Sequence, residues 1–242
     1  MTAVPIYTRI GKAVLLLYRK QFYVFQNRKP IPATIRNYIP ADFAALIRIQ
    51  QECFPPPFPS ELWWSEEQLQ SHVTHFPEGT LCIEVDGQLV GSMTSLLIDF
   101  DPNDAEHTWA NITDNGYIRT HNPNGNTLYI VDLCVSPAYR SLGLGKWLML
   151  SMYEIVIEQK RIRLLGGSRM PNYHQHAAVL SPEAYIEGVM CGDISDQVIS
   201  FLLRCGRMPI KIVPHYLEDE ESHHYGVLME WRNPFFPTEE AY

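Results

Sequence analysis

Two glycines and an arginine stand between a predicted strand and a predicted helix, in the segment Arg140-Ser-Leu-Gly143-Leu-Gly145-Lys. Glycine has no Cβ, so successive backbone N–H groups in such a loop can converge on one ligand. The helix that follows adds the partial positive charge of its N-terminus, and Arg140 adds a planar cation. The combination indicates a phosphate site, although an ordinary tight turn between a strand and a helix explains the two glycines equally well.

Two well-known phosphate-binding loops do not match this segment. A P-loop has Ser or Thr after its Gly-Lys pair, whereas Trp147 follows Lys146 here. A dinucleotide-binding loop has a third glycine, but Leu148 stands three residues beyond Gly145. A phosphate ligand at this loop would therefore belong to another class of cofactor or substrate.

The predicted strand ahead of the loop carries one acidic residue. Residues 128–135 are apolar in both alternations, as expected of a strand that is buried on both faces. Asp132 interrupts that run, and its carboxylate is either a catalytic base or a paired structural group that holds a neighbouring loop. His174 and His176 follow the next predicted strand and are candidates for a proton relay.

Hydrophobic periodicity predicts helices and strands on both sides of this strand. Asp86-Gly87 is a strong two-residue hairpin turn within residues 80–98. Residues 99–126 are polar but contain aromatic residues, and we expect an ordered flap there. The remaining predicted elements are a strand at 35–38, a helix from Pro40, a helix over 61–76 capped by Ser60, a helix at 146–159, a strand at 163–167, helices at 182–191 and 195–205, and strands at 211–213 and 225–231.

Composition limits the class of protein. The chain has 242 residues, of which 46% are hydrophobic, enough for one large core or two small ones. Its formal net charge of -8 argues against nucleic acid as the main partner, which would need a concentrated basic face. The five cysteines include no C-x-x-C pair and indicate reduced thiols. The apolar run 11–18 is too short to span a membrane, so we expect a cytoplasmic protein.

We expect the main domain to begin after a basic, proline-bearing connector at 27–32. The predicted organisation is an N-terminal extension over residues 1–33, a domain over 34–232 and a C-terminal tail over 233–242. Within the extension, residues 10–26 are expected to form a docking helix or strand.

The loop and its surroundings resemble a known family. Val135-x-Pro137-x-Tyr139-Arg140-Ser-Leu-Gly143-Leu-Gly145 resembles the acetyl-CoA pyrophosphate loop of the GNAT N-acetyltransferase superfamily, in which Arg or Gln is followed by two residues, Gly, one residue, and Gly or Ala. The expected order of strand, two helices, hairpin, central strand, loop and helix is also the GNAT order. The resemblance extends over residues 34–232.

This resemblance implies an α/β GNAT fold, with a mixed, mostly antiparallel sheet, splayed central strands and flanking helices. It implies acetyl-CoA as the cofactor, with the pantetheine arm on the backbone of Leu133, Cys134 and Val135. A backbone N–H near Leu133 or Cys134 would polarise the thioester carbonyl. An amine acceptor must lose a proton, for which Asp132 is the candidate base. The residues that would hold the pyrophosphate are Arg140, Ser141, Leu142, Gly143, Leu144, Gly145 and Lys146.

One feature departs from the family. Many GNAT enzymes place a Tyr four residues before the Gly of a Gly-Phe pair, where it protonates the departing thiolate. The corresponding residues here are Leu202 and Gly206, and Arg207 follows in place of Phe. Tyr173 or Tyr185 are candidates to replace the missing acid, and a thiol with a pKa of about 8.5 is already a tolerable leaving group.

Other segments, among them "FPEGTLCIEVDGQLVGS" and "GGSRMPNYHQHA", more closely resemble the acetyltransferase-like domain that some bacterial proteins fuse to a carbon–nitrogen hydrolase. We therefore expect a free-standing version that transfers acetyl from acetyl-CoA to an amine of a small molecule or peptide. The alternative is a catalytically weak CoA-binding or interaction module, one that partners such a hydrolase. A homodimer stays open, and the histidine pairs 174/176 and 223/224 are expected to be surface or relay groups rather than metal ligands.

Overall fold

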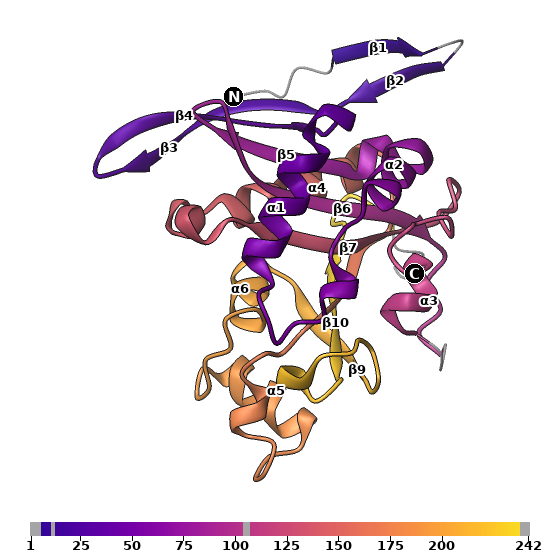
Figure 1. Ribbon diagram of the computed structural model, residues 1–242. Coiled ribbons are helices and arrows are strands. Elements are labelled where there is room, and N and C mark those ends of the chain that lie inside the picture. Colours follow the sequence, from indigo (N-terminus) through magenta and orange to yellow (C-terminus); the bar gives the residue numbers. More distant parts are fainter. Residues whose placement is uncertain (1–5, 11–12, 104–106, 238–242) are drawn as a thin grey trace.

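A computed structural model describes residues 6–10, 13–103 and 107–237. An eight-stranded sheet forms its centre, in the order β3-β4-β5-β6-β7-β8-β10-β9 (Figure 1). All neighbours are antiparallel except β7 and β8, which are parallel. The strands are β3 (Arg19–Gln26), β4 (Lys29–Asn37), β5 (Thr80–Val85), β6 (Gln88–Ile98), β7 (Thr127–Val135), β8 (Arg163–Ser168), β9 (Met208–Val213) and β10 (Gly226–Arg232). The expected mixed, mostly antiparallel sheet is confirmed.

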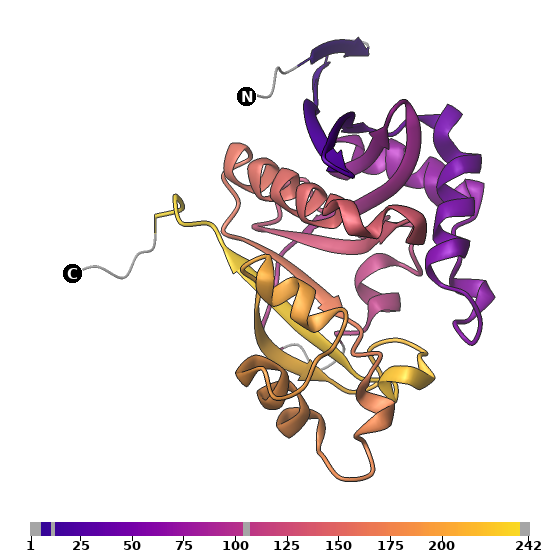
Figure 2. The same cartoon turned by 90° about the vertical axis from the view of Figure 1, so that its left-hand side faces the viewer.

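Helices cover both faces of the sheet. The α-helices are α1 (Phe43–Cys53), α2 (Glu66–His75), α3 (Trp109–Thr113), α4 (Leu144–Glu158), α5 (Pro182–Cys191) and α6 (Ile199–Arg204). The 3-10 helices are η1 (Pro40–Asp42), η2 (Ser60–Leu62), η3 (Pro77–Gly79), η4 (Pro137–Leu142), η5 (Tyr173–Gln175) and η6 (Glu220–Ser222). In Figure 2, α1 lies on one side of the sheet and α4 on the other. Both helices bury one apolar face against it, as their sequence periodicity predicts.

The central strands part at one point. β7 pairs with β8 only through its first three residues, ending at Tyr129 opposite Leu165. On its other side β7 stays paired with β6 as far as Val135, with a register shift between Thr94 and Ser95. An extra residue in one strand bends and twists the ladder locally. The edge of β7 from Ile130 onward is therefore left without a strand on the side of β8, and this is the expected splay.

The N-terminal part of the chain differs from expectation. Residues 19–37 form a hairpin, β3 and β4, that belongs to the large sheet, so the boundary expected between residues 33 and 34 falls inside β4. Asn27 and Arg28 form its turn with φ of 51° and 66°, a two-residue geometry that suits a hairpin but that these residue types signal weakly. β1 (Ile6–Ile10) and β2 (Ala13–Leu17) form a separate two-stranded sheet.

Two predicted helices start later than expected. The helix expected from Ser60 is interrupted, because Ser65 caps α2 instead, in a capping box with Gln68. Residues 60–62 form only the 3-10 turn η2. The helix expected from residue 195 starts at Ile199, since the Asp196 carboxylate accepts the backbone N–H groups of Val198 and Ile199, each at 2.9 Å. In both cases a side chain just ahead of the helix, Ser65 for α2 and Asp196 for α6, accepts N–H groups at its start.

The segment 99–126 is ordered where the structure describes it, as expected of a flap. It contains α3, and its Ile118 is fully buried. Residues 104–106 of this segment lie outside the described residues. The indole N–H of Trp109 reaches back to the carbonyl oxygen of Val131 in β7, at 3.1 Å. The segment is thereby joined to the central strand at the point where the strands part.

Candidate functional site

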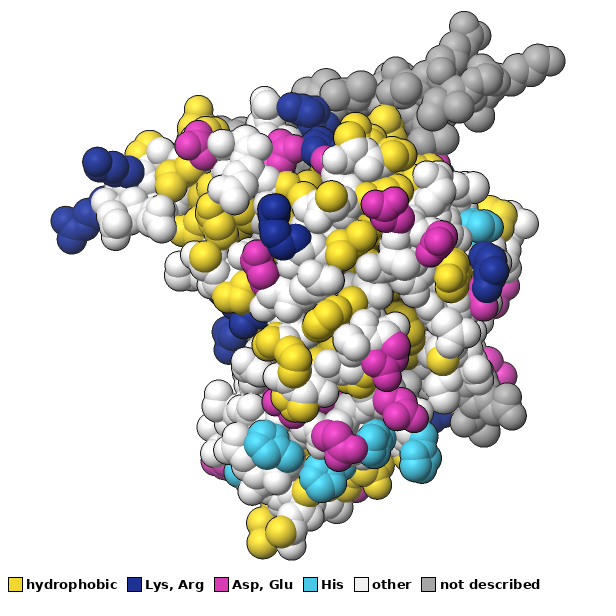
Figure 3. Space-filling model, viewed as in Figure 1, with side chains coloured by type: hydrophobic (Ala, Val, Ile, Leu, Met, Phe, Trp, Pro, Cys, Tyr) yellow, Lys and Arg dark blue, Asp and Glu magenta, His cyan; other side chains and the backbone are white. Residues whose placement is uncertain are grey.

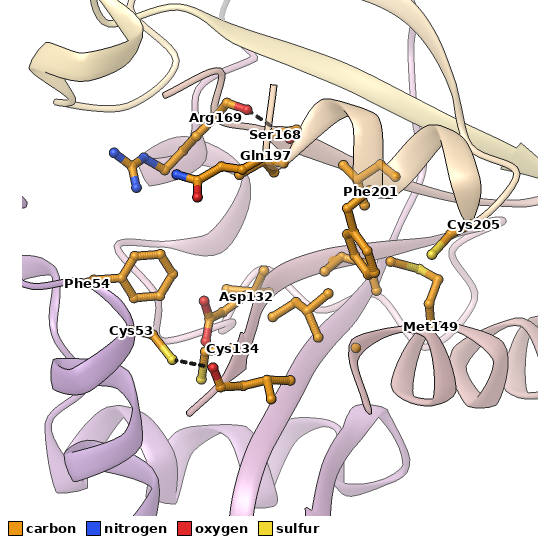
Figure 4. A pocket seen from close by; sticks show the side chains of 18 of the residues that line it. Cys53, Phe54, Asp132, Cys134, Met149, Ser168, Arg169, Gln197, Phe201 and Cys205 are labelled. Atoms are coloured by element: carbon orange, nitrogen blue, oxygen red, sulfur yellow. Dashed lines mark hydrogen bonds between the residues drawn. The ribbon is translucent and has the colours of Figure 1, made fainter. Parts of the chain in front are cut away.

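A cavity of about 730 Å³ lies where β7 and β8 separate. Figure 4 shows side chains from α1, β7, α4, β8 and α6 facing it. Its size matches the range of a small-molecule or cofactor site. The residues that line it and matter below are Cys53, Trp64, Trp109, Asp132, Leu133, Cys134, Val135, Arg140, Ser141, Gly143, Gly145, Lys146, Phe201, Leu202, Cys205, Arg207 and Tyr216.

One end of the cavity is the loop between β7 and α4. η4 leads into Gly143, whose φ of 71° lies in the left-handed region that favours glycine. Gly143 is the N-cap of α4, and no side chain caps that helix. The free N–H groups of its first turn are thus left to a ligand, and a Cβ added at Gly143 would meet no atom within 4 Å. Such an open cradle fits a pyrophosphate.

Five of the seven residues predicted to hold the pyrophosphate line the cavity: Arg140, Ser141, Gly143, Gly145 and Lys146. The side chains of Leu142 and Leu144 are not in its lining, and Leu144 is fully buried in the core. The backbone of this pair can still contribute N–H groups to the cradle. The exposed Arg140 side chain bends back, with its Nε donating to the carbonyl oxygen of Val135 at 3.3 Å.

The free edge of β7 leads from this loop into the cavity. Ser136 donates its N–H to the carbonyl oxygen of Val90 in β6, at 2.8 Å. Backbone groups alternate in direction along a strand, so those of Cys134, two residues earlier, also point toward β6. Leu133 and Val135 then direct their backbone groups to the open side, where the Val135 carbonyl accepts the Cys53 thiol at 3.1 Å. Of the two residues proposed to polarise a thioester carbonyl, Leu133 has the N–H with the suitable direction.

Asp132 faces the cavity from the middle of β7, next to Cys134 (Figure 4). Its Oδ2 atom is buried and has no hydrogen-bond partner among the described residues. Burial raises the pKa of this carboxyl group to about 6, although the nearby polar groups of Trp64 and Cys134 act in the opposite direction. A carboxylate whose pKa lies near neutrality, with one free oxygen in a cavity, is suited to accept a proton.

The other predicted catalytic side chains lie elsewhere. Tyr173 is buried, with its hydroxyl bound to the carbonyl of Leu180 at 3.0 Å, and the Tyr185 hydroxyl donates to Asp196 at 2.7 Å. His174 is exposed, and its Nδ1 lies 2.7 Å from the carbonyl oxygen of Pro171. None of the three lines the cavity, nor does His176. The geometry therefore gives no support to direct roles for Tyr173 and His174, because their polar atoms are engaged or point outside.

Histidine and acidic side chains gather on one face at the α5 end of the molecule (Figure 3). His224 lies 3.8 Å from Glu220 there, and His223 packs edge-on against Tyr173 at 5.6 Å between ring centroids. Within the described ranges, no group of three or more His, Cys, Asp or Glu residues is arranged to hold a metal ion. No described helix is both long and apolar enough to cross a bilayer.

Sequence reasoning missed several residues of the cavity wall. Trp64, which precedes α2, and Trp109, in the segment 99–126, lie next to each other in its lining, with ring centroids 6.3 Å apart. Tyr216 follows β9 and packs against Gly167 of β8, where an added Cβ would be 2.0 Å from its ring. Arg207 follows α6. The local signals for these residues were glycines, since glycine marks close approach of a neighbour: Gly116 lies against Trp64 and Trp109, Gly166 against Arg207, and Gly167 against Tyr216.

An uncapped helix N-terminus at a glycine loop is joined by one cavity to the open edge of a parted strand, so the fold and site are those of an α/β protein that can bind a phosphate-bearing ligand. The chain belongs to the acetyltransferase (GNAT) family, whose family model matches residues 43–178. Acyl-CoA is the donor that this family uses. The resemblance on which the loop was interpreted is thus confirmed.

Individual relatives agree with this assignment. The chain is 55% identical over 221 residues to the uncharacterized N-acetyltransferase YkwB of Bacillus subtilis (strain 168), covering 91% of this chain and 98% of YkwB. It is 40% identical over 200 residues to the probable hydrolase YhcX of the same organism, covering 82% of this chain but 38% of YhcX. Among solved structures, the GphF GNAT-like decarboxylase in complex with isobutyryl-CoA matches with a TM-score of 0.69 and 26% identity, over 82% of this chain and 98% of that one.

Proposed function

We propose that this protein transfers an acetyl group from acetyl-CoA to an amine of a small molecule or peptide, by direct attack in a ternary complex. The observation that carries the proposal is the Oδ2 atom of Asp132, a buried carboxylate oxygen without a partner among the described residues. It faces the same cavity as the anion-binding loop at Arg140 to Lys146. One cavity thereby holds both a donor site and a base.

The chemistry assigns a role to each part of the cavity. The loop and the N-terminus of α4 bind the pyrophosphate, and the free edge of β7 pairs with the pantetheine arm. The N–H of Leu133 donates to the thioester carbonyl oxygen, where negative charge develops. Asp132 accepts the proton of the attacking amine, directly or through one water molecule.

Binding of the donor is tested first, by calorimetry with CoA and acetyl-CoA. Arg140→Ala removes a cation from the pyrophosphate and should weaken both ligands about tenfold, less so at high salt because Arg140 is exposed. No affinity for either ligand in the wild-type protein would overturn the proposal. Release of CoA thiol in the presence of a panel of amines then tests transfer. Including isobutyryl-CoA, the ligand of the GphF structure, tests whether acetyl is the preferred acyl group.

A second function belongs to another class, a CoA-binding module that does not turn over. It is favoured by Leu202, which lines the cavity at the position that, by the family resemblance, holds a Tyr acid for the departing thiolate in many GNAT enzymes. The match to part of YhcX supports a hydrolase as the partner of such a module. Tight CoA binding with no thiol release for any amine, and capture of a hydrolase in a pull-down, would favour this function. Acyl transfer that is lost in Asp132→Asn would exclude it.

A further inference from the structure

Arg207 is a buried cation in the wall of the cavity. It follows α6 and is only 3% exposed. Its hydrogen bonds run to neutral carbonyl oxygens, from Nε to Met229 at 3.2 Å and from Nη2 to Gly166 at 3.1 Å. Among the described residues, no carboxylate forms an ion pair with it. Arg169, which also lines the cavity, differs in this respect, because Asp219 and Glu221 each pair with it at 2.7 Å.

A buried guanidinium group without a counter-ion is uncommon, because burial of an unpaired charge is costly. Burial lowers the pKa of Arg207 to about 10, which still leaves it charged at neutral pH. The titratable groups that face Arg207 are uncharged at neutral pH, because burial raises the pKa of each of the tyrosines and of the cysteine among them. These groups are Tyr153 in α4, Tyr129 in β7, Cys205 after α6 and Tyr216 after β9. The guanidinium group of Arg207 is therefore available to pair with an anion inside the cavity, because no described carboxylate already neutralises it.

The position of Arg207 coincides with the point where the strands part. The last β7–β8 pair is Tyr129 with Leu165, so Ile130 and Gly166 occupy the first open position. A Cβ added at Gly166 would lie 3.1 Å from the Ile130 carbonyl oxygen and 3.2 Å from Arg207 Nη2. The missing side chain of Gly166 thus allows the guanidinium group to reach the apex of the opening. Arg207 lines the same cavity as Leu133, whose N–H is assigned to the thioester carbonyl, and the apex at Ile130 lies three residues along β7 from Leu133.

The same wall carries Leu202, whose hydrocarbon side chain cannot donate a proton. We propose that Arg207 stabilises the thiolate of CoA as it leaves, in place of an acid at that position. This inference rests on the proposed function. The amine nitrogen forms a bond to the carbonyl carbon and gives its proton to Asp132, while the carbon–sulfur bond breaks. The electron pair stays on sulfur, next to the guanidinium group, until the thiolate takes a proton from water.

The direct test measures the thiol of CoA bound to the wild-type protein. Ultraviolet absorbance of the thiolate is followed during a pH titration, with the complex of desulfo-CoA as the blank that subtracts the protein's own cysteines. A cation close to the sulfur should lower the thiol pKa by about one unit relative to free CoA in the same buffer. A bound thiol pKa equal to or above the free value would overturn the inference without any variant.

Variants separate the charge of Arg207 from its packing. Arg207→Lys keeps the charge and should keep most of the shift, whereas Arg207→Met should return the thiol pKa to the free value or above. Arg204→Met removes a cation from the exposed rim of the same cavity and should leave the thiol pKa unchanged. Loss of the shift in Arg204→Met to the same degree as in Arg207→Met would overturn the specific role of Arg207.

Two further outcomes are distinguishable. If Arg207→Met lost affinity for carboxylated donors such as malonyl-CoA, kept its affinity for acetyl-CoA and left the thiol pKa unchanged, Arg207 would be a carboxylate-binding residue and the inference would be wrong. If the wild-type protein bound no CoA, the proposed function would fail and this inference with it. If CoA bound but its thiol pKa were not shifted, this inference would be wrong and the proposed function would be unaffected.

Discussion

Asp132 shows at the scale of one residue how a strand can carry both structure and chemistry. Its neighbours on β7 are apolar, and its Oδ2 atom has no partner among the described residues. A group of that kind destabilises the fold, because its charged form has lost water without gaining an equal partner. Its raised pKa therefore predicts effects on activity and on stability that have opposite signs.

The first prediction concerns activity. If the carboxylate form is the proposed base, kcat/KM for acyl transfer should rise with pH through about 6 and then level off. Asp132→Asn should lower kcat/KM by roughly 10² to 10⁴ and remove this inflection, while CoA affinity changes by less than about threefold. Steady-state kinetics from pH 5 to 8 provide the measurement. An unchanged inflection in the variant would show that another group is responsible.

The second prediction concerns stability. The folded-state pKa of Asp132 is raised from 3.8 to about 6, so folding costs free energy where the unfolded chain would ionise this group, and the cost is complete above pH 6. Asp132→Asn should therefore increase the free energy of unfolding by roughly 1–3 kcal/mol at pH 7. The gain should shrink as the pH falls from 6 and vanish below about 4. Urea unfolding of the wild-type protein and the variant at pH 7 and at about pH 4 checks this. A variant that is less stable than the wild-type protein at pH 7 would contradict it.

At the scale of the element, the loop and α4 act together. Gly143 ends η4 in a left-handed conformation and opens α4 without a capping side chain. The helix is held by Leu148, Met149 and Met152, all fully buried, so its N-terminus keeps a constant direction. A rigid helix makes the N–H cradle at its start a preformed site rather than one that must be ordered by the ligand.

Gly143→Ala tests this element. Alanine at a φ of 71° should cost about 1 kcal/mol of stability and place a methyl group in the open cradle, weakening CoA binding. Gly192→Ala is the matched control, because Gly192 has a φ of 85° with nothing within 4 Å of an added Cβ, outside the cavity lining. Both variants should lose similar stability in thermal unfolding, and only Gly143→Ala should lose CoA affinity in calorimetry. Equal affinities in the two variants would contradict a role for the loop.

At the scale of the whole molecule, the first strands of the sheet support the helix of the site. The ring of Phe22 on β3 lies 4.3 Å from that of Trp147 on α4, between centroids. Tyr18 donates to Ser151 at 2.9 Å, and Lys20 pairs with Glu154. The hairpin β3–β4 therefore packs on the helix whose N-terminus adjoins the proposed anion-binding loop.

Two truncations test this arrangement. Removal of residues 1–33 takes away β3 and the buried Tyr18, Phe22 and Val24, each worth roughly 1.5–3 kcal/mol, which together approach a typical net stability. We expect that chain not to fold. Among the described strands, removal of residues 1–17 takes away β1 and β2, which pair with each other, and should leave a cooperative thermal transition. Circular dichroism of the two chains checks the prediction, and a folded product from the larger deletion would contradict it.

The sequence by itself determined the features whose physics lies within a few residues. The Asp86-Gly87 turn, the buried strand around Asp132 and the glycine loop before α4 were predicted correctly, because positive φ, alternation and helix N-termini leave local patterns. The start of α2 was missed, since Ser60 and Ser65 carry the same local signal and packing decided between them.

The tertiary structure alone decided how distant residues meet. It separated β7 from β8 after Tyr129, brought Arg207 to that opening, and removed Tyr173 and His174 from the cavity. It also joined residues 19–33 to the main sheet. These outcomes depend on strand pairing and burial between segments far apart in the chain, and neither leaves a local pattern. The loop could be located from the sequence because glycines and a helix start leave a local pattern, whereas the buried charge of Arg207 in the cavity wall could be found only from the fold.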